Sequence, residues 1–123
     1  MYTPVEVMAQ AVSHLASYLA VAVPTFGWAA GRRVLVKKGS GHETNKCLAT
    51  GRSTETDVMR TLSYFNTINF ADRVGCRALV GIDSRDDVVP AKTAYAVVNH
   101  MVPPPEVLEL SVSHSTDLEE ARW

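Results

Sequence analysis

The chain has 123 residues, of which 46% are hydrophobic and 20% are charged, and its formal net charge is −1. This length accommodates one domain at most. The near-neutral charge gives no electrostatic reason to expect nucleic acid or an anionic membrane as a partner. The two cysteines, Cys47 and Cys76, lack metal-ligand spacing. We therefore expect neither a disulfide scaffold nor a zinc site, and a reducing, cytoplasmic compartment.

An uncharged stretch from Val7 to Gly31 is about as long as a membrane span. Polar residues and a proline interrupt it, and the opening sequence MYTPVE lacks the basic region of a signal peptide. We therefore expect no membrane segment. Residues 4–17 instead predict a helix with one apolar face. The short run YLAVAVP that follows predicts a strand covered on both faces, as in a parallel sheet.

Residues 30–57 are polar and rich in glycine, so their pattern allows short helices but sets no boundaries. Helical signals sharpen from Thr54, a candidate N-cap that is followed by acids in the first turn. The run CRALVGI at residues 76–82 predicts a second strand, a helix beginning near Pro90 follows, and residues 103–114 contain a third strand. This alternation predicts an α/β fold with about three parallel strands and covering helices.

Ionisable residues follow two of the predicted strands. The second strand enters a loop with Asp83, Asp86 and Asp87, and the third strand ends at His114. Ligands and catalytic groups gather at the carboxyl ends of parallel strands. A carboxylate and an imidazole there suit a catalytic triad, in which the carboxylate orients the histidine and the histidine takes a proton from the nucleophile. The alternative is a solvated acidic loop without catalytic function.

Three motifs in this part of the sequence resemble the acetyl xylan esterase and cephalosporin-C deacetylase family. They are TLSYFNTINFADRVGCRALVGI, DDVVPAKTAYAVVNH and EVLELSVSH, and they occur in the family's order and spacing. The resemblance runs from about Val12 to His114 and implies the C-terminal part of an α/β-hydrolase fold. It implies deacetylation of small acetyl esters, with Asp86 as the triad aspartate, His114 as the triad histidine, and no cofactor or metal.

The sequence departs from the family's pattern at two places that matter for catalysis. Asp83 and Ser84 stand where the family has Gly-Leu, a change that can alter where Asp86 points. No G-x-S-x-G motif is present, although this family holds its nucleophilic serine in such an elbow. We therefore expect residues 1–123 to be a partial domain without the N-terminal half that carries the elbow. Alone, such a chain should have little or no esterase activity.

Two functions remain open from the sequence. The first is a truncated or split serine carboxylesterase that acts on a small acetylated substrate once the missing half is supplied. The second is a non-catalytic remnant or interaction domain. Because either would leave a sheet edge unpaired, we expect a homo-oligomer or a partner chain.

Several other residues are expected to be structural rather than catalytic. Tyr64, Phe65 and Asn69 match the family and are expected to pack around the catalytic loop. His100 is expected to end a helix. The remaining histidines and both cysteines are expected to be structural, solvated or chemically inert: His14, His42, Cys47 and Cys76.

Overall fold

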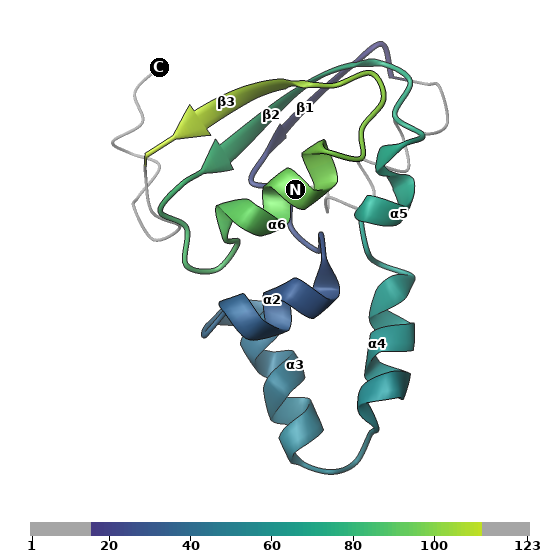
Figure 1. Ribbon diagram of the computed structural model, residues 1–123, viewed down its shortest axis with the longest axis vertical. Coiled ribbons are helices and arrows are strands. Elements are labelled where there is room, and N and C mark those ends of the chain that lie inside the picture. Colours follow the sequence, from purple (N-terminus) through teal and green to yellow (C-terminus); the bar gives the residue numbers. More distant parts are fainter. Residues whose placement is uncertain (1–15, 112–123) are drawn as a thin grey trace.

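The computed structural model describes residues 16–111, which form an α/β arrangement around one three-stranded sheet (Figure 1). The strands are β1 (Tyr18–Ala22), β2 (Arg77–Asp83) and β3 (Glu106–Leu110), and they lie in the order β1-β2-β3. Both pairings are parallel. The predicted three parallel strands are therefore confirmed, whereas the helix predicted at residues 4–17 falls almost entirely outside the described residues.

The central strand β2 is the most deeply covered element of the sheet. Every residue from Val80 to Asp83 is buried. The prediction that the run YLAVAVP forms a strand covered on both faces is wrong, because three of the five residues of β1 are exposed. The residues of β3 are likewise exposed or half-buried. β3 lies at the edge of the described sheet and has β2 as its only neighbour there.

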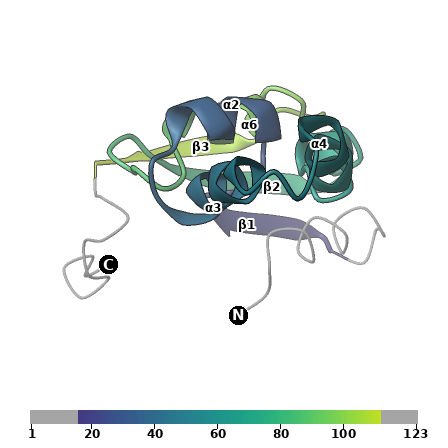
Figure 2. The same cartoon turned by 90° about the horizontal axis from the view of Figure 1, so that it is seen from below.

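Helix α6 (Ala91–Val98) lies across the sheet and closes the core (Figures 1 and 2). It begins directly after Pro90, whose carbonyl oxygen accepts hydrogen bonds from the backbone N–H and the hydroxyl of Thr93, both at 2.8 Å. The short helix α5 (Ile68–Ala71) packs beside it. The core joins residues of β1, β2, α5, α6 and the adjoining loops: Leu19, Ala71, Val74, Ala78, Val80, Ile82, Ala94, Val97 and Met101.

Three helices form a group of their own between β1 and β2, below α6 in the view of Figure 1. They are α2 (Ala29–Leu35), α3 (Gly39–Ala49) and α4 (Glu55–Ser63). The sequence pattern left most of this region without boundaries because these helices bury few apolar side chains. In α3 only Gly41 is buried, and α4 has no buried residue.

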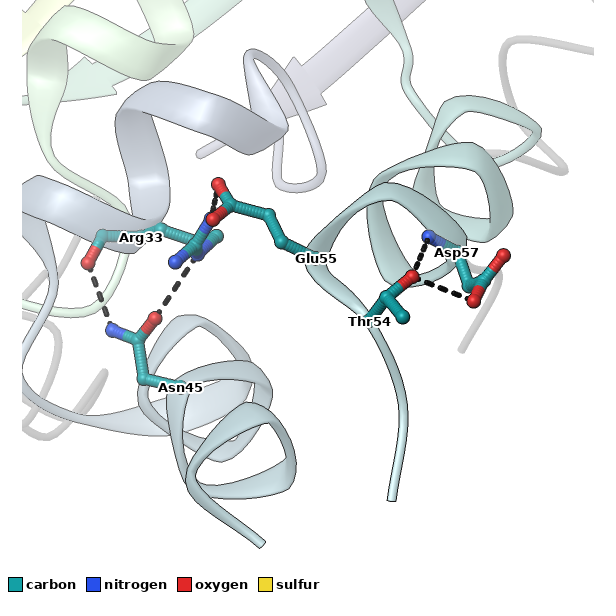
Figure 3. Close-up of polar contacts among 5 residues, drawn as sticks. All are labelled: Arg33, Asn45, Thr54, Glu55 and Asp57. Atoms are coloured by element: carbon teal, nitrogen blue, oxygen red, sulfur yellow. Dashed lines mark hydrogen bonds and ion pairs between the residues drawn. The ribbon is translucent and has the colours of Figure 1, made fainter. Parts of the chain in front are cut away.

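Polar contacts hold the three helices together (Figure 3). Arg33 of α2 donates from Nε to Asn45 Oδ1 at 3.1 Å, and Asn45 Nδ2 donates to the Arg33 carbonyl oxygen at 2.9 Å. The guanidinium group of Arg33 also forms an ion pair with Glu55 of α4. The predicted N-cap is confirmed, because Thr54 Oγ1 accepts the backbone N–H of Asp57 at 3.2 Å.

No helix within residues 16–111 is long and apolar enough to cross a bilayer.

A close backbone approach joins the segment after β1 to α6. A Cβ atom at Gly27 would lie 2.4 Å from Val97 Cγ2 and 2.8 Å from the Thr93 carbonyl oxygen. Since the carbonyl belongs to the helix backbone, relief of the clash would require one element to move. The absence of a side chain at Gly27 therefore allows this contact.

We predict that Gly27→Ala lowers the free energy of unfolding by about 1–3 kcal/mol because the added methyl overpacks this junction. Urea unfolding followed by circular dichroism measures the change. Gly81→Ala is the matched control, since a Cβ there meets its nearest atoms at 3.6–3.8 Å, an ordinary contact distance. Equal losses in the two variants would contradict the steric argument.

Candidate functional site

The candidate site lies at the carboxyl end of the sheet, in the loop between β2 and α6. The register places Asp83 opposite Leu110, so β2 and β3 end side by side. Ser84 extends this pairing, because its backbone N–H and its hydroxyl both donate to the Leu110 carbonyl oxygen, at 2.9 and 3.1 Å. The loop that contains Asp86 thus starts next to the chain segment that leads away from β3.

The three acidic residues of this loop have different environments. Asp83 and Asp86 are buried, at 3% and 6% exposure, whereas the side chain of Asp87 is 50% exposed. Asp83 Oδ1 accepts the backbone N–H of Arg85 at 3.0 Å, which folds the start of the loop. Asp87 forms an ion pair with Lys38 at 2.8 Å, and this contact raises the pKa of Lys38 through hydrogen bonding and charge. The loop is therefore not a uniformly solvated acidic turn.

Asp86 is held by its own loop. Its Oδ1 accepts the backbone N–H groups of Val88 and Val89, both at 2.8 Å. Two hydrogen bonds of this kind fix the orientation of a carboxylate. A fixed, buried carboxylate at a strand end is what the orienting acid of a triad requires.

An open depression of about 520 Å³ borders this carboxylate. Asp86 and Ser84 contribute to one part of its wall, and Lys37, Lys38 and Lys92 contribute cationic groups around it. Apolar atoms provide most of its surface.

The sequence patterns gave no indication of Arg32, which the structure places near Asp86. Arg32 is 5% exposed, and burial lowers the pKa of its guanidinium while the charge of Asp86 raises it. Its Nη2 donates to the Val88 carbonyl oxygen at 3.5 Å, in the same loop. The sequence could not distinguish Arg32 from its neighbour Arg33, because both are arginines. The two differ in burial and in hydrogen-bond partners, which depend on the fold.

The histidines and the two cysteines differ in how far the structure tests what the sequence predicted for them. His114 lies outside the described residues, so its position relative to Asp86 stays a prediction. The catalytic roles assigned to Asp86 and His114 also stay predictions. His100 lies two residues beyond the end of α6, close to the expected position, with Nδ1 at 2.7 Å from the Ala96 carbonyl oxygen. His14 lies outside the described residues, and His42 is half-buried in α3. Both cysteines are free, with Cys47 exposed and Cys76 half-buried.

The expectation that Tyr64 and Phe65 pack around the loop is wrong, because their side chains are 71% and 51% exposed. Asn69 instead caps the preceding turn by donating from Nδ2 to the Ser63 carbonyl oxygen at 2.8 Å. Asn66 Oδ1 accepts the backbone N–H groups of Trp28 and Ile68 at 3.2 and 3.3 Å. Within residues 16–111, no group of three His, Cys, Asp or Glu side chains is arranged to hold a metal.

A parallel sheet with a buried aspartate just beyond its central strand has the architecture of an α/β-hydrolase. Two acetyl xylan esterase structures share this fold. That of Paenibacillus sp. R4 aligns with a TM-score of 0.80 and 24% identity, over 92% of this chain and 37% of that one. That of Thermoanaerobacterium sp. JW/SL YS485 aligns with a TM-score of 0.77 and 18% identity, over 89% and 36%. A monoacylglycerol lipase from Paleococcus ferrophilus aligns with a TM-score of 0.58 and 12% identity, over 95% and 60%.

The sequence itself matches the acetyl xylan esterase (AXE1) family over residues 8–119. The chain therefore belongs to the acetyl xylan esterase family, and the resemblance in its motifs is confirmed. It spans little more than a third of the length of the two acetyl xylan esterases it aligns with.

We predict that Asp86→Ala lowers the free energy of unfolding by about 1–3 kcal/mol, because the amides of Val88 and Val89 lose their acceptor. Asp86→Asn should lose less, since its side-chain oxygen can still accept. Urea unfolding of the three proteins measures this order. Asp87→Asn is the matched exposed control and should change the unfolding midpoint little. If Asp86→Ala unfolds at the same midpoint as Asp87→Asn, the loop does not depend on the buried carboxylate.

Proposed function

We propose that this chain supplies the aspartate and the histidine of a serine carboxylesterase site that deacetylates small acetyl esters. The observation that carries the proposal is the buried carboxylate of Asp86, held by two amides at the end of β2. Membership of the acetyl xylan esterase family supports the reaction class. The adjacent end of β3 supports the choice of His114, because that residue follows Leu110 by four positions and an extended chain covers about 3.3–3.6 Å per residue.

In the proposed mechanism, Asp86 accepts the N–H of one ring nitrogen of His114 and so fixes the tautomer of the imidazole. The other ring nitrogen removes the proton of a serine hydroxyl as that oxygen attacks the acetyl carbonyl carbon. The resulting imidazolium returns the proton to the departing alcohol. Water then hydrolyses the acetyl-enzyme by the same proton transfers, which releases acetate. The charge of Asp86 stabilises the imidazolium in both steps.

The nucleophile is proposed to come from polypeptide outside these 123 residues, since the sequence contains no G-x-S-x-G elbow. The same outside segment would supply the oxyanion hole. Removing a member of a triad that acts as a unit eliminates most of its rate enhancement. The chain alone is therefore proposed to hydrolyse acetyl esters slowly or not at all. No cofactor or metal is required for this chemistry, and a cytoplasmic location stays a prediction.

The esterase prediction is tested in two steps with 4-nitrophenyl acetate and a serine-reactive fluorophosphonate. The chain alone should show neither turnover nor labelling. A chimera in which this chain replaces the matching third of the Paenibacillus sp. R4 esterase should show both. In the chimera, Asp86→Asn should lower kcat by roughly 10³–10⁴-fold because the imidazole loses its orienting carboxylate. Asp87→Asn is the control and should retain activity.

Three outcomes would contradict parts of this proposal. Turnover by the chain alone that disappears in His114→Ala would show that it holds its own nucleophile. A folded but inactive chimera would remove the esterase assignment. Equal activity in the Asp86→Asn and Asp87→Asn chimeras would assign the orienting role to another residue.

A second candidate function is a non-catalytic interaction domain that binds another chain. The exposure of apolar side chains on the edge strands favours it: Tyr18 of β1 is 49% exposed, and Val107 and Leu108 of β3 are 38% and 40% exposed. Unpaired strand edges with apolar residues promote association through main-chain pairing. The same surfaces would serve a homo-oligomer or a partner that completes the sheet.

We predict that the chain self-associates in a concentration-dependent manner, as measured by sedimentation velocity. The double substitution Val107→Lys and Leu108→Lys should shift the distribution toward monomer, because charged edge residues oppose strand pairing. Val34→Lys is the control, since Val34 is 84% exposed on α2, away from the sheet. A sharply unfolding monomer at every concentration, with or without the β3 substitutions, would contradict self-association.

A further inference from the structure

Arg32 of α2 is a buried cation whose contacts join three separate segments. Its Nη1 donates to Thr25 Oγ1 at 2.7 Å, in the segment after β1, and its Nη2 donates to Ser40 Oγ at 2.9 Å, in α3. The same Nη2 donates to the Val88 carbonyl oxygen at 3.5 Å, in the loop that contains Asp86. The guanidinium carbon also lies 5.5 Å from the centre of the Phe26 ring.

One peptide group connects this cation to the carboxylate of Asp86. The carbonyl oxygen of Val88 and the N–H of Val89 belong to the same peptide unit, which is trans. The oxygen accepts from Arg32, and the N–H donates to Asp86 Oδ1 at 2.8 Å. Because C=O and N–H point in opposite directions in a trans peptide, the cation and the carboxylate lie on opposite sides of it. Both charges polarise the group in the same sense and strengthen the two hydrogen bonds.

We propose that Arg32 is a positioning residue that fixes the Asp86 carboxylate through the Val88–Val89 peptide group. The direction in which Asp86 can meet an imidazole would then depend on Arg32, and this second part rests on the esterase function proposed above. A planar guanidinium suits the task, because its nitrogens reach Thr25, Ser40 and Val88 in one fixed fork, which a lysine ammonium cannot reproduce.

The hydrogen bonds of Arg32 do not satisfy all of the nitrogen atoms of its buried guanidinium group. Within the part of the chain that the structure describes, its Nε is buried without a hydrogen-bond partner. A buried donor left unpaired costs stability, and such groups are uncommon in native structures. A guanidinium that polarises the peptide next to Asp86 gains an electrostatic interaction that offsets part of this cost. Asp86 raises the pKa of Arg32 against the effect of burial, in agreement with that interaction.

Amide hydrogen exchange, measured by NMR on the full 123-residue chain, tests this link without requiring esterase activity. In Arg32→Met, exchange at Val89 should accelerate by about tenfold relative to the amides of β2, since its hydrogen bond loses orientation and polarisation. Arg32→Lys should give a smaller effect, because an ammonium can still donate to Val88. Arg33→Met is the matched control on the same helix and should leave the Val89-to-β2 ratio unchanged.

Either of two exchange results would overturn the inference. One is unchanged protection of Val89 in Arg32→Met, and the other is equal acceleration at Val89 and throughout β2, which would mean general destabilisation. If Arg32→Met does not fold, Thr25→Val and Ser40→Ala test the same link, since each removes one support of the guanidinium. Selective acceleration at Val89 in these variants would support the inference, and no change would overturn it.

The chimera described above provides the catalytic readout. There Arg32→Met should lower kcat by about tenfold and leave KM unchanged, because orientation of the triad changes but ester binding does not. An inactive chimera together with selective exchange at Val89 would remove the proposed function and leave the structural role of Arg32 intact. An active chimera in which Arg32→Met has full kcat would remove the positioning role in catalysis.

Discussion

The buried carboxylate of Asp86 is the constraint on which the arrangement of this site depends. At 6% exposure it has lost most of its contact with water. Removing a charge from water costs several kcal/mol unless the protein replaces the lost hydration. The loop meets this requirement by turning back so that the amides of Val88 and Val89 donate to Oδ1. This turn also sets the start of α6, which begins at Ala91 directly after the loop.

The helical group between β1 and β2 is tied to the same loop. Besides Arg32, the start of α3 contacts it at two places: Lys38, which precedes the helix, pairs with Asp87, and Gly39, its first residue, lies against Val88. Gly39 has a φ of +65°, and a Cβ there would lie 2.8 Å from Val88 Cγ1. Both the backbone conformation and the close approach favour glycine. The helical group between β1 and β2 therefore packs against the loop that contains Asp86.

The sequence predicted the features that have a local signal. Short apolar runs predicted all three strands, and the polar loop after CRALVGI placed Asp86 at a strand end. The helices of residues 29–49 were not delimited, because the contacts that hold them join residues distant along the chain, such as Arg33 and Glu55. The exposure of β1 could not be inferred either, since an edge strand and a central strand can share one apolar pattern. The exposure of β3 does have a signal, in Glu106 and Glu109.

Arg32 shows the same limit at the level of a single side chain. Its residue type predicts a solvated cation, and only the fold brings Thr25, Ser40 and Val88 to its guanidinium. Contacts between residues that are far apart along the chain leave no periodic signal in a single sequence. The position of Asp86 at a strand end was therefore predictable from its loop, whereas the burial of Arg32 near it was not.

Asp83 and Ser84, which stand where the resemblance implies Gly-Leu, both form hydrogen bonds at the end of β2. A leucine at position 84 offers only its backbone N–H to the Leu110 carbonyl oxygen. Ser84 adds a hydroxyl, and the two donors lie at 2.9 and 3.1 Å from that oxygen, which has two lone pairs to receive them. Asp83 folds the next peptide through its contact with the N–H of Arg85. Ser84 therefore fastens the ends of β2 and β3 to each other, so the loop of Asp86 starts beside the chain that leads from β3.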